Sequence, residues 1–176
     1  TCKNGGDIGA LVIDYYFDFY EALFSYQPSV ETEITLSCLD LSKITAVEQA
    51  VNTLFTSVNS DVLAGQMATA SRCRYSSKAF GKYATTTSYD LIDLKHIANL
   101  LAPYYSQASV LSNAVDSAVV CSRSNVANAN GLSIYHPYEE ISQASAINSI
   151  YSNFRFAPVY AEYIKSIHTY NYIKIR

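Results

Sequence analysis

Hydrophobic residues recur every three or four positions between residues 7 and 26, and acidic side chains occupy another face. The apolar positions are Ile8, Leu11, Tyr15, Phe19, Leu23 and Tyr26, and the acidic ones are Asp14, Asp18 and Glu21. This period matches one face of an α-helix. Pro28 follows, and proline does not continue a helix. We therefore predict an amphipathic helix over residues 7–26.

The pattern then changes from helical to extended. Residues 33–39 form a short apolar and β-branched run, which predicts a strand. Residues 40–42 supply side chains that can cap a helix, and helical spacing of apolar residues follows from Ile44 to Val58. The order of strand, cap and helix indicates an α/β unit.

Four more helices are predicted farther along the chain. Their apolar positions keep helical spacing over residues 61–73, 90–101, 107–118 and 159–167. In the first of them, Leu63, Met67 and Ala70 are expected to point inward. Asp90 can cap the second, and Pro103 interrupts the chain after it.

Two short apolar runs, residues 119–121 and 132–135, predict strands. A polar, Asn-rich turn separates them, which favours a hairpin or adjacent positions in one sheet. Residues 74–88 lose periodicity and carry Gly81 and three consecutive threonines, so we predict a loop there. We find no repeat and no linker, and predict that residues 1–176 form a single unit of α/β class.

Composition adds an expectation about the surface of the molecule. Charged residues make up 15% of the chain and hydrophobic ones 49%, whereas soluble proteins average roughly 25% charged residues. There are 16 tyrosines and no tryptophan, and tyrosine buries its ring while its hydroxyl can stay at a half-wet boundary. Either the chain packs against another protein surface, or the tyrosines fill the rim of its core.

The charge balance argues against two classes of partner. A net charge of -3 gives no general attraction to nucleic acid or to an anionic membrane. No apolar run reaches the 18 or so residues that a membrane span needs. Thr1 begins without a methionine or a signal segment, so we expect the start to be a processing or cloning boundary.

Only three histidines could serve as a catalytic base. His96 fits the polar face of the helix predicted over residues 90–101, and His168 sits near the end of the last helix, where the helix dipole favours an imidazolium. His136 ends a predicted strand, and such positions commonly face a cleft. However, Pro137 restricts His136 to an extended conformation, which explains the position without catalysis. We interpret His136 as strand-end surface.

The four cysteines, Cys2, Cys38, Cys73 and Cys121, are widely spaced and have no zinc-finger spacing. We expect buried free thiols, and one or two disulfides are the alternative for an exported protein. Cys38 and Cys121 fall in apolar strand-like runs, where a desolvated thiol ionises poorly. They fit the core better than the role of a nucleophile.

Two further groups of residues suggest chemistry only weakly. Basic and aromatic side chains that could bind RNA gather at Arg72, Arg74, Tyr75, Lys78, Phe80, Lys82 and Tyr83. The negative net charge favours a solvated loop or a partner contact instead. Asp90 and Asp93 could contribute to a calcium site, but the mixed Asp/Gly loop of an EF-hand is missing and capping explains Asp90. No HExxH, phosphate-binding, dinucleotide-binding or GxSxG motif occurs.

Three segments of the chain read ITLSCLDLSKITAVEQAVNTL (residues 34–54), SYDLIDLKHIANLL (88–101) and GLSIYHP (131–137). In this order they resemble the C-terminal portion of clostripain-family cysteine peptidases. The family pattern has T-L-S-x-x-D-L-S-K-I before a helix, then Y-D-L-x-D, then G-L-S-I-Y-x-P in a late strand. Residues 6–20, GDIGALVIDYYFDFY, also resemble the helix that follows the catalytic region of the family. The resemblance would place Thr1 downstream of that region.

The resemblance implies a caspase-like α/β/α fold, with this chain as its C-terminal part of short strands and about six helices. It also implies cleavage of protein or peptide substrates after arginine or lysine by a His/Cys dyad. The family's histidine sits in a His-Gly pair and its cysteine follows an acidic residue, and neither motif occurs here. We carry over no catalytic, cofactor-binding or metal-binding residue, and expect the dyad upstream of Thr1.

The implied partner is the N-terminal catalytic portion, or light chain, of the same protein, because the family cuts itself into light and heavy chains. No cofactor is evident in the chain, and calcium is suggested by the resemblance alone. We expect a secreted or cell-envelope location and no nucleic-acid partner. The alternative hypothesis is a non-catalytic interaction or adhesion domain with the same fold.

Overall fold

The computed structural model describes residues 4–26, 33–80, 91–136 and 156–174, with side chains up to residue 167. Its helices are α1 (Gly5–Tyr26), η1 (Leu41–Lys43, a 3-10 helix), α2 (Ile44–Leu63), α3 (Ala68–Ser76), α4 (Leu94–Leu101), α5 (Gln107–Ala118) and α7 (Pro158–Lys174). Its strands are β1 (Thr35–Leu39), β2 (Ala79–Phe80), β3 (Leu91–Asp93), β4 (Val119–Ser124) and β5 (Ser133–Tyr135). The described residues thus form six α-helices and short strands, which confirms the predicted α/β class.

The described strands make two small antiparallel sheets. β1 pairs with β4, and β3 lies between β2 and β5. The prediction that residues 119–121 and 132–135 are neighbours in one sheet is therefore wrong. The polar segment between β4 and β5 is long enough to carry the chain from one sheet to the other, so each strand pairs with an earlier part of the sequence.

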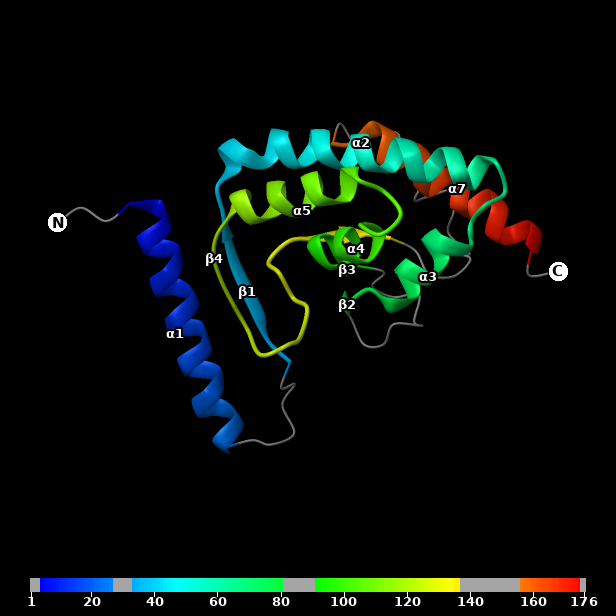
Figure 1. The fold of residues 1–176 in the computed structure, drawn as a ribbon. Helices are drawn as coiled ribbons and strands as arrows, with labels where there is room; N and C mark the ends of the chain where they lie inside the picture. Colours follow the sequence, from blue (N-terminus) through cyan, green and yellow to red (C-terminus); the bar gives the residue numbers. More distant parts are fainter. Residues whose placement is uncertain (1–3, 27–32, 81–90, 137–155, 175–176) are drawn as a thin grey trace.

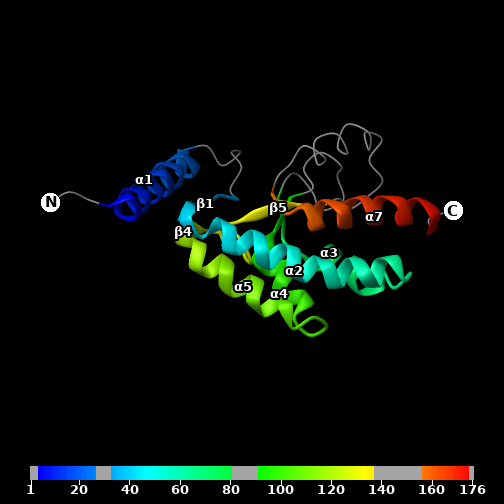
Figure 2. The same ribbon diagram turned by 90° about the horizontal axis from the view of Figure 1, so that it is seen from above.

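The main hydrophobic core lies among the helices. α2 packs against both α5 and α7, and α4 packs against α5 (Figures 1 and 2). The helical spacing of α2 places on one face the fully buried residues Val47, Val51, Leu54, Phe55, Val58 and Val62. Because these side chains contact two other helices, α2 is the central element of the core.

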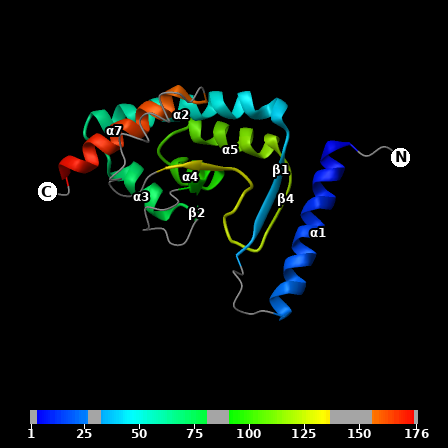
Figure 3. The ribbon, with the colours of Figure 1, turned by 180° about the vertical axis from the view of Figure 1, so that it is seen from behind.

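A smaller cluster joins α1 to the first sheet. α1 lies beside β1 and β4 at the opposite end of the molecule from the C-terminal end of α7 (Figures 1 and 3). Ile13 and Phe17 of α1 are buried against Ile34, which precedes β1. This cluster is separate from the main core.

The helix predicted over residues 7–26 is confirmed, and most of the apolar positions that define its amphipathic pattern are exposed. The exposed side chains on α1 include Ile8, Leu11, Val12, Tyr15, Phe19 and Tyr26. The acidic face turns toward β4 instead, because Arg123 lies 4.6 Å from the centre of the Phe17 ring and within 3.0–3.7 Å of Asp14, Asp18 and Glu21. The low content of charged residues favours apolar surface on the protein, and α1 carries such a surface.

Several predicted boundaries shift in the structure. α2 runs on to Leu63, which is 55% exposed and not inward, and Gly65 follows the C-cap residue with a positive φ of 80°. Residues 61–73 are therefore not one helix, although Met67 and Ala70 are buried as predicted. Residues 74–80, predicted as a loop, contain the end of α3 and β2, and residues 81–90 lie outside the described residues.

The helices predicted at 107–118 and 159–167 are confirmed as α5 and as part of α7. No described helix is long and apolar enough to cross a membrane. That the whole of 1–176 forms a single unit stays a prediction.

Candidate functional site

The three motif-bearing segments of the sequence meet around Asn130 and Gly131. Ser37 of β1 donates from its hydroxyl to the Gly131 carbonyl at 2.5 Å, and the N–H of Leu94 in α4 donates to the Leu132 carbonyl at 2.9 Å. A hollow of about 200 Å³ beside this junction is lined by residues 35–37, 131–133 and Phe80. We call the contact of β1, α4 and residues 130–132 the motif junction.

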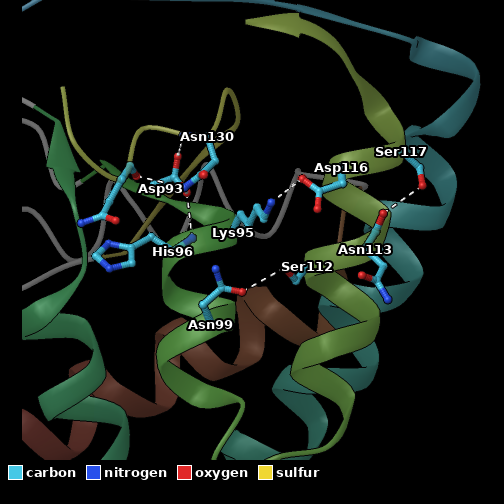
Figure 4. Close-up of polar contacts among 10 residues, drawn as sticks. Asp93, Lys95, His96, Asn99, Ser112, Asn113, Asp116, Ser117 and Asn130 are labelled. Atoms are coloured by element: carbon cyan, nitrogen blue, oxygen red, sulfur yellow. Dashed lines mark hydrogen bonds and ion pairs between the residues drawn. The ribbon is translucent and has the colours of Figure 1, made fainter. Parts of the chain in front are cut away.

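Asp93 is the central side chain of the motif junction (Figure 4). Its fully buried carboxylate accepts hydrogen bonds from the His96 N–H at 2.7 Å, the Asn130 N–H at 2.5 Å and the Asn130 side-chain amide at 2.9 Å. The first of these bonds makes Asp93 the N-cap of α4. A buried carboxylate is stable here because three donors replace water.

The N-cap role belongs to Asp93, so the prediction that Asp90 caps this helix is wrong. Residues 91–93 form β3, and α4 begins at Leu94. Asp90 itself lies outside the described residues. A helix that begins at Leu94 leaves the His96 N–H free, three residues after Asp93, whereas the sequence pattern alone also allows a start after Asp90.

Gly131 is the residue that lets the segments approach so closely. Its φ is 97°, a conformation that glycine adopts without strain. A Cβ at this position would lie 3.1 Å from both the Ser37 Cβ and a Val119 methyl carbon. A side chain would therefore push β1 and β4 away from the segment that enters β5.

His96 is part of the scaffold rather than of a solvated helix face. Its ring Nδ1 accepts a hydrogen bond from the Lys78 N–H at 2.8 Å, so the neutral ring carries its proton on Nε2. Burial lowers the pKa of His96, and the charge of Asp93 opposes this shift. The prediction of a solvated His96 is wrong, because the ring faces the turn between α3 and β2.

Two further polar contacts fix α4 against α5 (Figure 4). Lys95 pairs with Asp116 at 2.5 Å, and the Ser112 hydroxyl donates to the Asn99 side-chain oxygen at 2.9 Å. With the Asp93 contacts, these bonds hold α4 on both sides. The arrangement positions backbone segments, and the charged side chains of Asp93, Lys95 and Asp116 are each engaged by a partner.

The donor set at Asp93 does not fit the calcium site suggested for Asp90 and Asp93. Both carboxylate oxygens of Asp93 already accept N–H groups, whereas calcium needs six to eight free oxygen ligands. Within the described ranges, no group of three or more His, Cys, Asp or Glu side chains could hold a metal ion.

His136 is buried, which corrects its interpretation as strand-end surface. Only 2% of the residue is exposed, and its Nε2 lies 2.9 Å from the Tyr163 hydroxyl of α7. The buried Arg74 donates from Nε to the His136 carbonyl at 2.6 Å, and the Tyr160 hydroxyl donates to the Tyr135 carbonyl at 2.6 Å. The end of β5 and the residue after it are thus in contact with α3 and α7. The spacing of residues in the sequence does not predict either contact.

The end of α7 also differs from the prediction for His168. The helix continues to Lys174, so His168 does not occupy the C-terminal turn where the dipole would favour an imidazolium. The side chain of His168, like the whole of Cys2, lies outside the described residues.

The described thiols are free and have structural surroundings. Cys73 is buried, its Sγ donates to the Leu100 carbonyl at 3.4 Å, and burial raises the pKa of the Cys73 thiol. Cys38 and Cys121 lie opposite each other in β1 and β4, half-buried beneath α1, and burial also raises the pKa of Cys121. A raised pKa leaves less thiolate at neutral pH, which agrees with the expectation of poor nucleophiles.

The basic and aromatic cluster does not assemble into one surface in the described residues. Arg74 is 3% exposed, and Lys78 pairs with Glu33 at 3.4 Å. Lys82 and Tyr83 lie outside the described residues. The structure therefore gives no support to an RNA-binding face at this segment.

Sequence reasoning missed Asn130, Arg74 and Tyr163 as positions that organise the fold. Asn130 precedes a glycine and was predicted only as part of a turn. Tyr163 had a signal, since it shares the apolar face of the last helix with Tyr160, but its hydroxyl partner is set by tertiary structure.

Comparison with known proteins adds one finding. A family model described as the Clostripain family matches residues 2–169. Searches of curated proteins and of solved structures gave no match. The matched range includes every segment of the motif junction.

Proposed function

Because this chain belongs to the clostripain family of cysteine peptidases, we propose that it is the C-terminal portion of an endopeptidase that cleaves after arginine or lysine. In this proposal the catalytic histidine and cysteine, and the carboxylate that selects the basic side chain, precede Thr1. The family implies a caspase-like fold and a protein substrate.

One observation carries this proposal: the described thiols and imidazoles are held by contacts that build the fold. His96 accepts from Lys78, His136 contacts Tyr163, and Cys73 donates to Leu100. A Cys/His dyad needs a thiol and an imidazole within hydrogen-bond reach, with the thiol readily ionised. These surroundings offer neither, and the sequence has no His-Gly pair.

We propose that the chain supports a catalytic portion rather than performing the chemistry itself. The motif junction fixes β1, β5 and α4 through buried polar bonds, as expected of a rigid scaffold under neighbouring loops. The exposed apolar side chains of α1 form a surface that a second structural unit could cover. That unit would be the N-terminal catalytic portion or light chain.

Peptide hydrolysis tests the proposal directly. The purified 176-residue chain and a longer natural chain that includes the preceding residues are assayed on arginyl and lysyl peptides. We expect no turnover by the 176-residue chain. We expect turnover by the longer one, lost when its upstream strand-end cysteine is replaced by alanine. Hydrolysis by the folded 176-residue chain alone would contradict the proposal.

A second candidate is a non-catalytic interaction or adhesion domain of the same family. The exposed apolar side chains of α1 support both candidates equally, because they would suit any protein partner. The two candidates differ upstream: a longer chain without a His-Gly pair and a strand-end cysteine would support the interaction domain. In either case we propose a secreted or cell-envelope location, which cell fractionation would test.

A further inference from the structure

Cys38 and Cys121 occupy directly opposite positions in the β1–β4 ladder. Residues directly opposite in an antiparallel pair have Cα atoms about 4.5–5.5 Å apart. Disulfides bridge Cα separations of about 4.4–6.8 Å. The strand register therefore brings these two cysteines within bonding range without movement of either strand.

Both sulfur atoms lie on the same side of the sheet, beneath α1. A Cβ built on Gly9 would overlap the Cys38 Sγ and lie 3.7 Å from the Cys121 Sγ. Burial, and after it the neighbouring Cys38 thiol, raises the pKa of Cys121. Because the side chains converge on one point under α1, their sulfur atoms face each other rather than pointing to opposite faces.

The two residues are free thiols in the structure and only half-buried. Cys73 provides the contrast, since it is buried and its Sγ faces a backbone carbonyl. A small reagent can therefore approach the Cys38 and Cys121 pair more easily than Cys73. Susceptibility to oxidation follows thiolate character as well as exposure, so the raised pKa of Cys121 slows its reaction near neutral pH and mildly alkaline conditions favour it. A second thiol nearby then closes the disulfide.

We propose that Cys38 and Cys121 form a disulfide site that joins β1 to β4 beneath α1 when the protein meets a small disulfide such as oxidised glutathione. This inference does not depend on the proposed function. It concerns how the first sheet is held together.

The exchange proceeds in two balanced steps. One cysteine thiolate attacks a sulfur of oxidised glutathione, which breaks the glutathione disulfide, forms a mixed disulfide and releases one glutathione thiolate. The other cysteine thiolate then attacks the protein sulfur of the mixed disulfide and releases the second glutathione. The protein loses two protons and two electrons, and one oxidised glutathione becomes two reduced molecules.

The bond would enclose the chain from residue 38 to residue 121, which includes α2 through α5. Cross-linking so long a segment restricts the unfolded chain and stabilises the folded one. We expect the oxidised form to melt about 5–10 °C above the reduced form.

The test uses the full 176-residue chain under native conditions. Samples are incubated with oxidised or reduced glutathione, alkylated, and compared by intact mass, non-reducing peptide mapping and thermal melting. The expected product carries two alkyl groups fewer than the reduced protein, contains a peptide linking Cys38 to Cys121, and melts higher. Cys38→Ser should abolish the linked peptide, and Cys73→Ala should leave it unchanged.

Peptide mapping of the unmodified sequence keeps the test valid even if a variant folds poorly. Mixed glutathione adducts without loss of both thiols, or linked peptides that contain Cys2 or Cys73 instead, would overturn the proposed site. A Cys38–Cys121 bond that leaves the melting temperature unchanged or lower would overturn its role in bracing the sheet.

Discussion

Tyr163 and His136 form a buried pair whose loss should be measurable. Replacing His136 with phenylalanine removes the Nε2 partner of the Tyr163 hydroxyl at a site of 2% exposure. We expect a loss of about 1–3 kcal/mol in the free energy of unfolding, because a buried hydroxyl without a partner is costly. Urea denaturation of His136→Phe, Tyr163→Phe and the double variant measures the coupling. A double variant as unstable as the sum of both would contradict this pairing.

Asp93 should matter far more than an aspartate in a surface ion pair. Asp93→Asn places an amide N–H₂ among three N–H donors, so at least one bond is lost at a fully buried site. We expect a loss of about 2–4 kcal/mol in unfolding free energy. Asp116→Asn is the matched control, since its exposed pair with Lys95 should contribute less than about 1 kcal/mol. Equal effects in urea denaturation would refute the central role of Asp93.

The lowered pKa of His96 predicts that the free energy of unfolding falls as the pH is lowered. Its pKa in the folded protein is lowered from 6.5, chiefly by burial, so the unfolded chain takes up a proton first as the pH falls. The contribution of His96 to stability is therefore complete above about pH 6.5 and is lost as the pH falls through the lower folded pKa. His96→Asn keeps an acceptor for the Lys78 N–H and should remove this part of the acid sensitivity. The comparison is urea denaturation of both proteins between pH 5 and pH 8, where parallel curves would exclude His96.

At the level of single residues, sequence reasoning identified side-chain types but not their partners. It noted Asp93 and His136, yet assigned the cap to Asp90 and placed His136 on the surface. The cap lies at Asp93 because residues 91–93 pair with β2 and β5 as a strand, and His136 is buried because it contacts Tyr163 of α7. Both causes are contacts between segments far apart in the chain. Local propensity contains no information about such contacts.

Among the elements, the docking of α1 depends on the absence of a side chain at Gly9. A methyl group there would overlap the Cys38 Sγ. Gly9→Ala should cost about 1–3 kcal/mol through overpacking, which exceeds the gain of about 1 kcal/mol in helix propensity. Adding Cys38→Ala removes the sulfur but keeps the Cβ, 2.8 Å from the added methyl carbon, and should restore part of the loss, as measured by urea denaturation. If the two substitutions were simply additive, the close contact would not be the cause.

Helix existence was more predictable than helix orientation. The period of apolar residues gave α1, α2, α5 and α7, because each keeps that period over many residues. It did not show which face of α1 packs on the sheet, where Arg123 of β4 pairs with the acidic side chains and covers Phe17. It also paired the late strands wrongly, since β4 and β5 find partners in β1 and β3 rather than each other.

For the whole molecule, the two hydrophobic clusters should differ in stability. α1 buries only Ile13 and Phe17 and contacts β1 and β4, whereas α2 buries seven residues between α5 and α7. We expect the amides of α1 to exchange with solvent through a local opening of lower free energy than those of α2. Hydrogen-exchange mass spectrometry measures both helices in one sample, with α5 as an internal reference. Equal protection of α1 and α2 would show that the molecule opens only as a whole.

The separation of partners along the chain has a consequence for biosynthesis. Asp93 binds Asn130, β1 pairs with β4, and α2 packs against α7. In each case an early segment makes its contacts with a segment that is synthesised later. A ribosome releases the N-terminal part first, and contacts between distant residues form late. The emerging chain will therefore keep β1 without its partner strand until residues 119–124 have been made, and α2 without α7 until residues 158–174 have been made.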